Sequence, residues 1–189
     1  TGLGMDASKV SLTMNNALAS VKGTAFGMGD AAKVAASTVA AGIKPGEDLT
    51  KTLRLTADAA TVANTRMSDM GNIVGKVAAA NKIQATEMNQ LMKRGIPIQT
   101  YLAATMGVTV DEVRKLSREG RISFADFQRA LEYGVGGAAK DSGKTFEGAM
   151  ENVEAALGRL GARLMGPAFD QMPTFLMGVI EQLDRLDPL

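Results

Sequence analysis

The stretch GIPIQTYLAATMGVTVDEVRKLSREGRISFADFQRAL, residues 95–131, decides the fold of this chain. It holds two capping boxes, Thr-x-x-Glu at 109–112 and Ser-x-x-Asp at 123–126. In a capping box, side chains at the start of a helix accept hydrogen bonds from backbone N–H groups that have no partner within the helix. Gly107 and Gly120 stand where the preceding helices must end, because glycine readily adopts the left-handed conformation that closes a helix. The stretch therefore predicts three short helices in succession.

Apolar residues recur at helical spacing along the rest of the chain, without the period-2 alternation of strands. Upstream helices are marked by Val10, Met14, Ala17 and Val21; by the Ala-rich run 30–41, which stops at Gly42; by Leu49, Leu53, Ala57 and Ala60; by Met67, Met70, Val74 and Val77; and by Met88, Leu91 and Met92. In the central stretch we expect buried faces at Val110, Val113 and Leu116 and at Phe124, Phe127 and Leu131. Gly71 and Gly75 disfavour the fourth of these helices. We predict an all-α protein, a multi-helix bundle of about eight to ten short and medium helices with a C-terminal helical extension.

We expect four regions along the chain. They are an N-terminal Ala-rich helical region (1–94), a three-helix module (95–137), a Gly-rich hinge (138–144) and coiled-coil-like helices (145–189). In the last region Phe146, Met150, Val153, Leu157, Leu160 and Leu164 alternate spacings of four and three. This is the pattern of a coiled-coil seam, which predicts self-association through residues 145–165. The chain opens without Met and ends just after a helical pattern, so we expect a fragment of a longer polypeptide.

The amino-acid composition excludes several classes of function. Aromatic residues make up only 4% of the 189 residues, so the core must rely on Ala, Met and Gly, which favours closely packed helices. With 21 basic and 20 acidic residues, the chain has no overall field to attract nucleic acid or anionic lipid. Neither cysteine nor histidine is present, which excludes disulfides and thiolates and removes the commonest general base and metal ligand.

No set of residues predicts an active site, so we expect no enzyme activity and no catalytic, cofactor-binding or metal-binding residues. Paired acids at 47–48 and 111–112 stand in first helical turns, where the helix dipole favours negative charge. Glycines at 27–32 and 134–139 match a relaxed dinucleotide fingerprint, but neither follows the strand which that fingerprint requires. We interpret both as loops between helices.

DNA binding is the alternative function, through a helix-turn-helix with helices at 97–106 and 109–119 and a turn at Gly107. The small residue, turn glycine and buried aliphatic residue that such units use are Ala103, Gly107 and Val113. However, acids at 111–112 occupy the turn of the second helix that would meet DNA. Between 111 and 121, four cations oppose three anions, whereas a DNA-binding surface carries a basic stripe.

The order and spacing of these motifs closely resemble the tape measure domain of tail tape measure proteins from long-tailed bacteriophages, especially the actinobacteriophage versions. The residues that carry the resemblance are 95–97, 102–109, 113–116, 119–123 and Phe124-x-x-Phe127, with 41–49 and 55–60 upstream and 134–139, 145–149 and 157–161 downstream. Each motif is moderately specific, and their combination is highly specific. The resemblance covers most of the chain.

The resemblance implies a structural virion protein of the phage tail lumen, made in the host cytoplasm. It implies roles in tail assembly, tail-length determination and genome ejection, with tail tube proteins, tail-tip proteins and tail assembly chaperones as partners. It implies no catalytic residues. The apolar stretch 164–180 is interrupted by Pro167, Asp170 and Pro173, so we expect a packed helix pair with at most weak contact with the host membrane. We expect no specific nucleic acid partner.

Overall fold

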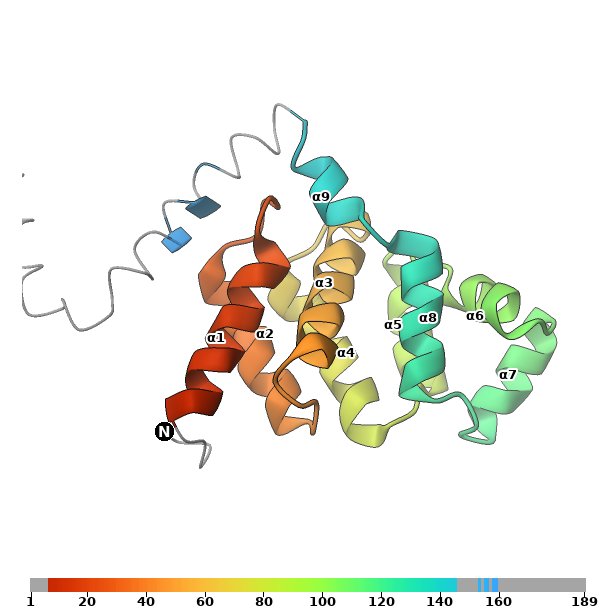
Figure 1. Cartoon of the computed structure of the whole chain (residues 1–189). Helices are drawn as coiled ribbons and strands as arrows, with labels where there is room; N and C mark the ends of the chain where they lie inside the picture. Colours follow the sequence, from red (N-terminus) through yellow and green to blue (C-terminus); the bar gives the residue numbers. More distant parts are fainter. Residues whose placement is uncertain (1–6, 146–152, 154, 157, 160–189) are drawn as a thin grey trace, which may run out of the picture.

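The computed structural model describes residues 7–145 and residues 153, 155, 156, 158 and 159. Within these residues nine α-helices follow one another and no strand occurs. They are α1 (Ala7–Val21), α2 (Met28–Ala40), α3 (Glu47–Val62), α4 (Met67–Ala80), α5 (Ala85–Lys93), α6 (Ile98–Met106), α7 (Val110–Arg118), α8 (Phe124–Val135) and α9 (Ala138–Ser142). Figure 1 shows an elongated row, with α1 and α2 at one end and α6 and α7 at the other. The predicted all-α bundle is confirmed.

The central helix is α3, which contacts α1, α2, α4, α8 and α9. Leu49 and Leu53 on one side of α3 belong to a core shared with α1 and α2. Leu55 and Ala59 on the other side belong to a second core shared with α4 to α8. A helix that is apolar on both sides must be covered on both sides. Therefore α3 joins the two halves of the row.

A close contact between α2 and α4 explains one of the glycines that disfavoured the fourth helix. Despite them, α4 runs unbroken over Met67–Ala80. A Cβ atom built on Gly71 would lie 2.7 and 2.8 Å from the two methyl carbons of Val34 on α2, whereas one on Gly75 would meet nothing within 4 Å. The missing side chain of Gly71 therefore allows the backbone of α4 to approach Val34.

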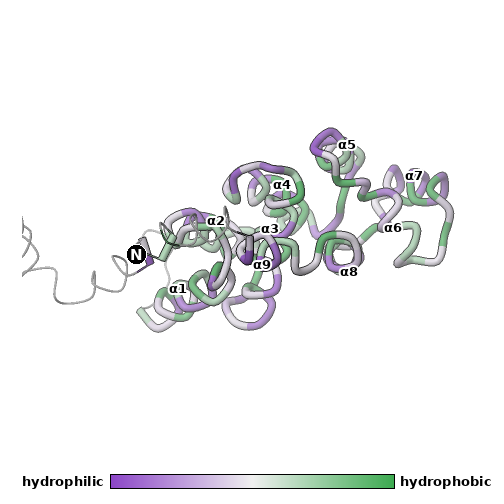
Figure 2. Tube along the Cα trace, turned by 90° about the horizontal axis from the view of Figure 1, so that it is seen from above, coloured by the Kyte–Doolittle hydropathy of each residue, from purple (hydrophilic) through white to green (hydrophobic). Residues whose placement is uncertain are grey.

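The second core is tied together by its connections as well as its helices. Phe127 of α8 is fully buried in it. The α4–α5 and α7–α8 connections run antiparallel, since the Ile83 N–H donates to the Ile122 carbonyl at 3.1 Å and the Phe124 N–H donates to the Asn81 carbonyl at 3.2 Å. Seen from above, the helices show both apolar and polar segments, as expected for amphipathic helices around shared cores (Figure 2).

The predicted ends of the central helices are confirmed. Gly107 and Gly120 have φ angles of 69° and 66°, in the left-handed region that closes helices. Both capping boxes are formed, at 109–112 and 123–126. Local hydrogen bonding thus sets where these helices begin and end.

Two predicted apolar faces are only partly buried. Met14 of α1 is 39% exposed, while the neighbouring Thr13 is buried. On α7, Val113 is fully buried, but Val110 and Leu116 are half-buried. Both helices lie at the ends of the row (Figure 1) and are covered on one side only, so part of each apolar stripe stays near solvent.

Part of the stretch predicted as a hinge is helical. Ala138–Ser142 form α9, which packs on α3 and buries Ala139. The reason is tertiary: a carboxylate of α3 accepts backbone N–H groups at the start of α9, as described below. The division into four regions stays a prediction. Most of the seam predicted over residues 145–165, and all of the stretch 164–180, lie outside the described residues.

Candidate functional site

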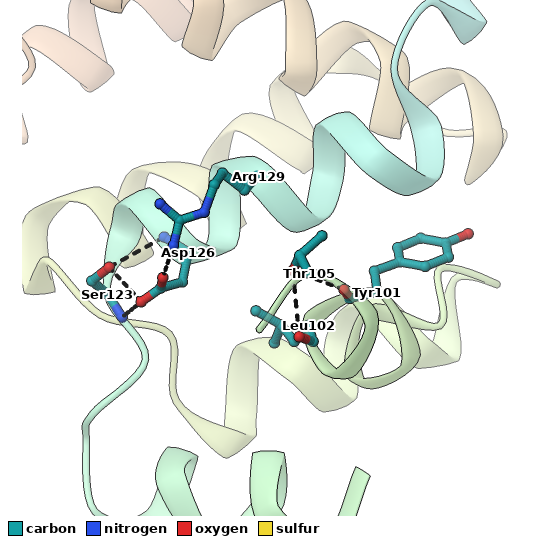
Figure 3. A network of polar contacts seen from close by, with 6 residues as sticks. All are labelled: Tyr101, Leu102, Thr105, Ser123, Asp126 and Arg129. Atoms are coloured by element: carbon teal, nitrogen blue, oxygen red, sulfur yellow. Dashed lines mark hydrogen bonds and ion pairs between the residues drawn. The ribbon is translucent and has the colours of Figure 1, made fainter. Parts of the chain in front are cut away.

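A network of polar side chains lies at the start of α8 (Figure 3). The Ser123 N–H donates to Oδ2 of Asp126 at 2.9 Å, and the Asp126 N–H donates to Oγ of Ser123 at 3.1 Å. The guanidinium of Arg129, one turn later, contacts the other oxygen of the same carboxylate. On the facing α6, the Thr105 hydroxyl donates to the Tyr101 carbonyl at 2.9 Å. These polar groups satisfy helix starts and backbone carbonyls rather than forming an open site.

The exposed face of α7 carries both signs of charge. Glu112 accepts hydrogen bonds from the backbone N–H of Thr109 at 2.8 Å and from its hydroxyl at 3.0 Å. These bonds lower the pKa of Glu112, so the start of α7 remains negatively charged at neutral pH. Asp111 pairs with Arg114 at 2.9 Å. A recognition helix needs an open or basic first turn to meet DNA, so the helix-turn-helix alternative is not favoured.

The paired acids do not converge on a site for proton transfer. Glu47 and Asp48 are exposed in the first turn of α3, as Asp111 and Glu112 are in that of α7. Residues 7–145 with the five later described positions contain no group of three or more acidic side chains that could hold a metal ion. In the same residues, no helix is long and apolar enough to cross a membrane.

One open groove, which we call the α2 groove, has a volume of about 880 Å³. Its walls are Ala25, Phe26, Gly27, Asp30, Ala60, Thr61, Asn64, Thr65, Arg66, Asp69, Ser142, Thr145 and Ala155. Two nitrogens of Arg66 donate to the two carboxylate oxygens of Asp69 at 3.2 Å each, and this bond lowers the pKa of Asp69. At one end, the guanidinium of Arg159 donates to the Phe26 carbonyl at 3.4 Å.

A second open groove, the α9 groove, has a volume of about 840 Å³. Its walls are Asn16, Ser20, Thr24, Gly46, Glu47, Thr50, Lys51, Arg54, Leu55, Asp58, Glu132, Gly136, Gly137, Ala139 and Lys140. Lys51 of α3 pairs with Glu132 of α8 at 2.7 Å across it. Asp58 lies at its base with only 7% of its surface exposed. Burial raises the pKa of Asp58 despite two backbone N–H groups that donate to its carboxylate.

Asp58 is the residue of this region that sequence reasoning missed. It is the one acid in the stretch LTADAA, residues 55–60, of a helix that is buried on both sides. A charged residue within such a stretch must find partners in the folded protein. The pattern could therefore have marked Asp58 as paired, but it could not identify a partner about eighty positions later in the sequence.

Taken together, these features define a helical packing module whose described polar side chains mainly cap helices and join them to one another. A family model described as "Tape measure protein" matches residues 1–166, so the chain belongs to the tape measure protein family. This family is structural, and the chain is a phage tail-related protein.

A curated relative supports this assignment. The chain is 30% identical over 130 residues to the Mu-like prophage FluMu protein gp42 of Haemophilus influenzae. The match covers 62% of this chain and 20% of the relative, so the chain spans about a fifth of that protein's length. No solved structure matches the chain.

Proposed function

We propose that this chain is a folded part of a tail tape measure protein that serves tail assembly and tail-length determination and takes part in genome ejection. The observation that carries the proposal is the family match over residues 1–166, which contains every described helix. The packing is consistent with a structural role, because the polar side chains at the starts of α7 and α8 act as helix caps and ion pairs.

The geometry of the bundle indicates how such a part would contribute to length. Placed end to end as one α-helix, the residues of the nine described helices would reach about 150 Å at 1.5 Å per residue. They instead fold side by side around two cores (Figure 1). We therefore propose that the extended, length-setting part of the tape measure lies outside this bundle.

The proposed partners are tail tube proteins, tail-tip proteins and tail assembly chaperones, within the tail lumen after synthesis in the host cytoplasm. We propose no enzyme activity, no specific nucleic acid partner and at most weak contact with the host membrane. Self-association through residues 145–165 has one structural support. Val153, a residue of the predicted seam, is 56% exposed, whereas Ala155 is 7% exposed. The described part of this helix thus has an apolar seam residue available to a partner helix.

The role in assembly can be tested in the phage or prophage that encodes the parent protein. Phe127→Ala removes a fully buried ring and should cost the module about 3–5 kcal/mol of stability. We expect few complete tails in electron micrographs of this variant. The matched control is Tyr133→Ala on the same helix, where the ring is 66% exposed and tails should form normally. The proposal would be contradicted if the bundle of the parent protein is shown to be unfolded and infectious tails still form in normal numbers.

The role in length needs a separate measurement. Deleting residues from an extended ruler shortens the tail by about 1.5 Å per residue. Deleting α6 to α8, residues 98–135, should instead prevent assembly without giving proportionally shorter tails. Tails shortened in proportion to that deletion would show that the bundle itself measures length.

The seam has its own test. The full chain should self-associate in sedimentation experiments, and Leu157→Asp with Leu160→Asp should leave it monomeric. A wild-type chain that sediments as a monomer at high concentration would exclude this contact.

A further inference from the structure

The carboxylate of Asp58 caps a helix that lies far from it in the sequence. Its two oxygens accept the backbone N–H groups of Gly137 at 3.0 Å and Ala139 at 2.9 Å. Gly137 is the N-cap residue of α9, and Ala139 is the second residue of that helix. N-caps are normally supplied by a side chain of the N-cap residue itself, which glycine lacks. Asp58 of α3 therefore takes the place of the capping side chain.

Apart from the two hydrogen bonds to Asp58, α9 is attached to the bundle by its packing on α3. The helix has five residues, of which Ala139 is the buried one. Isolated helices of this length are unstable in water, so α9 depends on its contact with α3. Gly136 and Gly137 precede it and Gly143 follows it, which gives the backbone freedom at both ends. Ala139 is thus the one buried apolar side chain that α9 would lose from the core on opening.

The surroundings of Asp58 are suited to such an opening. The α9 groove is open to solvent and is lined beside Asp58 by Ser20 and Thr24 of α1 and the following turn. If α9 moves away, water can reach the carboxylate and replace the two lost hydrogen bonds. Ala139 is the residue of α9 in the core that α3 shares with α1 and α2, and the other buried members of that core lie in α1 to α4.

We propose that Asp58 and residues 136–143 form a latch, the α9 latch, in which α9 detaches from α3 while α1 to α8 stay folded. The hydrogen bonds to Asp58 determine how often the latch opens. Opening removes the attachment of the chain to α3 at α9, whereas the hydrogen bond from Arg159 to the Phe26 carbonyl is a separate attachment to the bundle. The latch requires no tail protein, so it can be tested on the purified chain independently of the proposed function.

The test is native-state hydrogen exchange on the full chain at several low urea concentrations. The exchange rates of the Gly137 and Ala139 amides should depend less on urea than the exchange rate of the Leu53 amide in the centre of α3, because a local opening exposes less surface than global unfolding. Asp58→Ala should speed exchange of the two amides at least about tenfold, since two hydrogen bonds to a charged group are lost. Asp111→Ala, which removes an exposed paired carboxylate, is the matched control and should leave both rates unchanged.

A second variant guards against a general loss of folding in Asp58→Ala. Gly137 has a φ angle of 88° and its side-chain position is exposed, so Gly137→Ala strains the latch without touching a core. It should also speed exchange at Ala139 and tryptic cleavage after Lys140, and the double variant should add less than the sum of the two effects. Two results would overturn the proposal. In the first, the Gly137 and Ala139 amides of the wild-type chain exchange only through global unfolding. In the second, neither variant changes their exchange rates.

Discussion

The close contact between α2 and α4 leads to a quantitative prediction about Gly71→Ala. The new methyl carbon would lie 2.7 Å from a methyl carbon of Val34, roughly 1 Å inside the usual carbon–carbon contact distance. Val34 is 2% exposed and has little room to move. Overpacking of this kind costs about 1–3 kcal/mol, against a gain of about 1 kcal/mol from replacing glycine within a helix.

Gly75→Ala, one turn later in α4, separates these two effects. A Cβ atom at Gly75 meets nothing within 4 Å, so this variant should show only the helix gain. We therefore expect Gly75→Ala to be more stable than Gly71→Ala by about 1–3 kcal/mol, which is the overpacking term alone. Urea unfolding followed by far-ultraviolet circular dichroism measures both, since the chain has no tryptophan for fluorescence.

A rescue experiment tests the assignment of the contact to Val34. Val34→Ala removes the two methyl carbons closest to the new side chain and leaves the Cβ of residue 34, at 3.3 Å. This variant should destabilise the bundle by about 1–3 kcal/mol on its own. In that background Gly71→Ala should become stabilising, because its methyl group enters the space left empty. Equal free energies of unfolding for the Gly71 and Gly75 variants would refute the reasoning, as would an effect of Gly71→Ala that does not depend on residue 34.

Three further predictions concern single polar groups. The Ser117 hydroxyl is the buried side-chain oxygen without a hydrogen-bond partner among the described residues. Ser117→Ala should therefore raise the urea midpoint, with a gain in the free energy of unfolding of up to about 1–2 kcal/mol. A lower midpoint would contradict this and indicate that the hydroxyl makes a hydrogen bond in solution. Thr109→Ala should cost about 1 kcal/mol and speed amide exchange at Glu112, and unchanged exchange there would mean that the capping box is not formed in solution. Burial raises the folded-state pKa of Asp58 above its ordinary value of 3.8, so its contribution to stability is fully present below that value and is lost as pH rises through the folded pKa. The wild-type chain should therefore gain stability relative to Asp58→Asn as pH falls from neutral towards 4, and a urea titration that shows no such gain would contradict this sign.

The sequence was most informative where the determining contacts are local. The capping boxes of α7 and α8 involve residues three positions apart, and Gly107 and Gly120 close helices by their own backbone conformation. These features predicted the helix starts, the helix ends and the all-α class. The same local motifs carried the resemblance to the tape measure family, which the family match over residues 1–166 confirms.

Contacts between distant residues could not be predicted in this way. The apolar spacing predicted the helix that is α4, and Gly71 disfavoured it. Only the packing of α4 against Val34 shows why a glycine stands there. The sequence predicted a hinge over 138–144, whereas Asp58 stabilises a helix there from 79 and 81 positions away. Capping is decided within one turn of chain, so the amino-acid order alone determines it. Burial and long-range hydrogen bonds depend on which helices contact one another. Only the tertiary structure, in which α3 lies between two cores, determines those contacts.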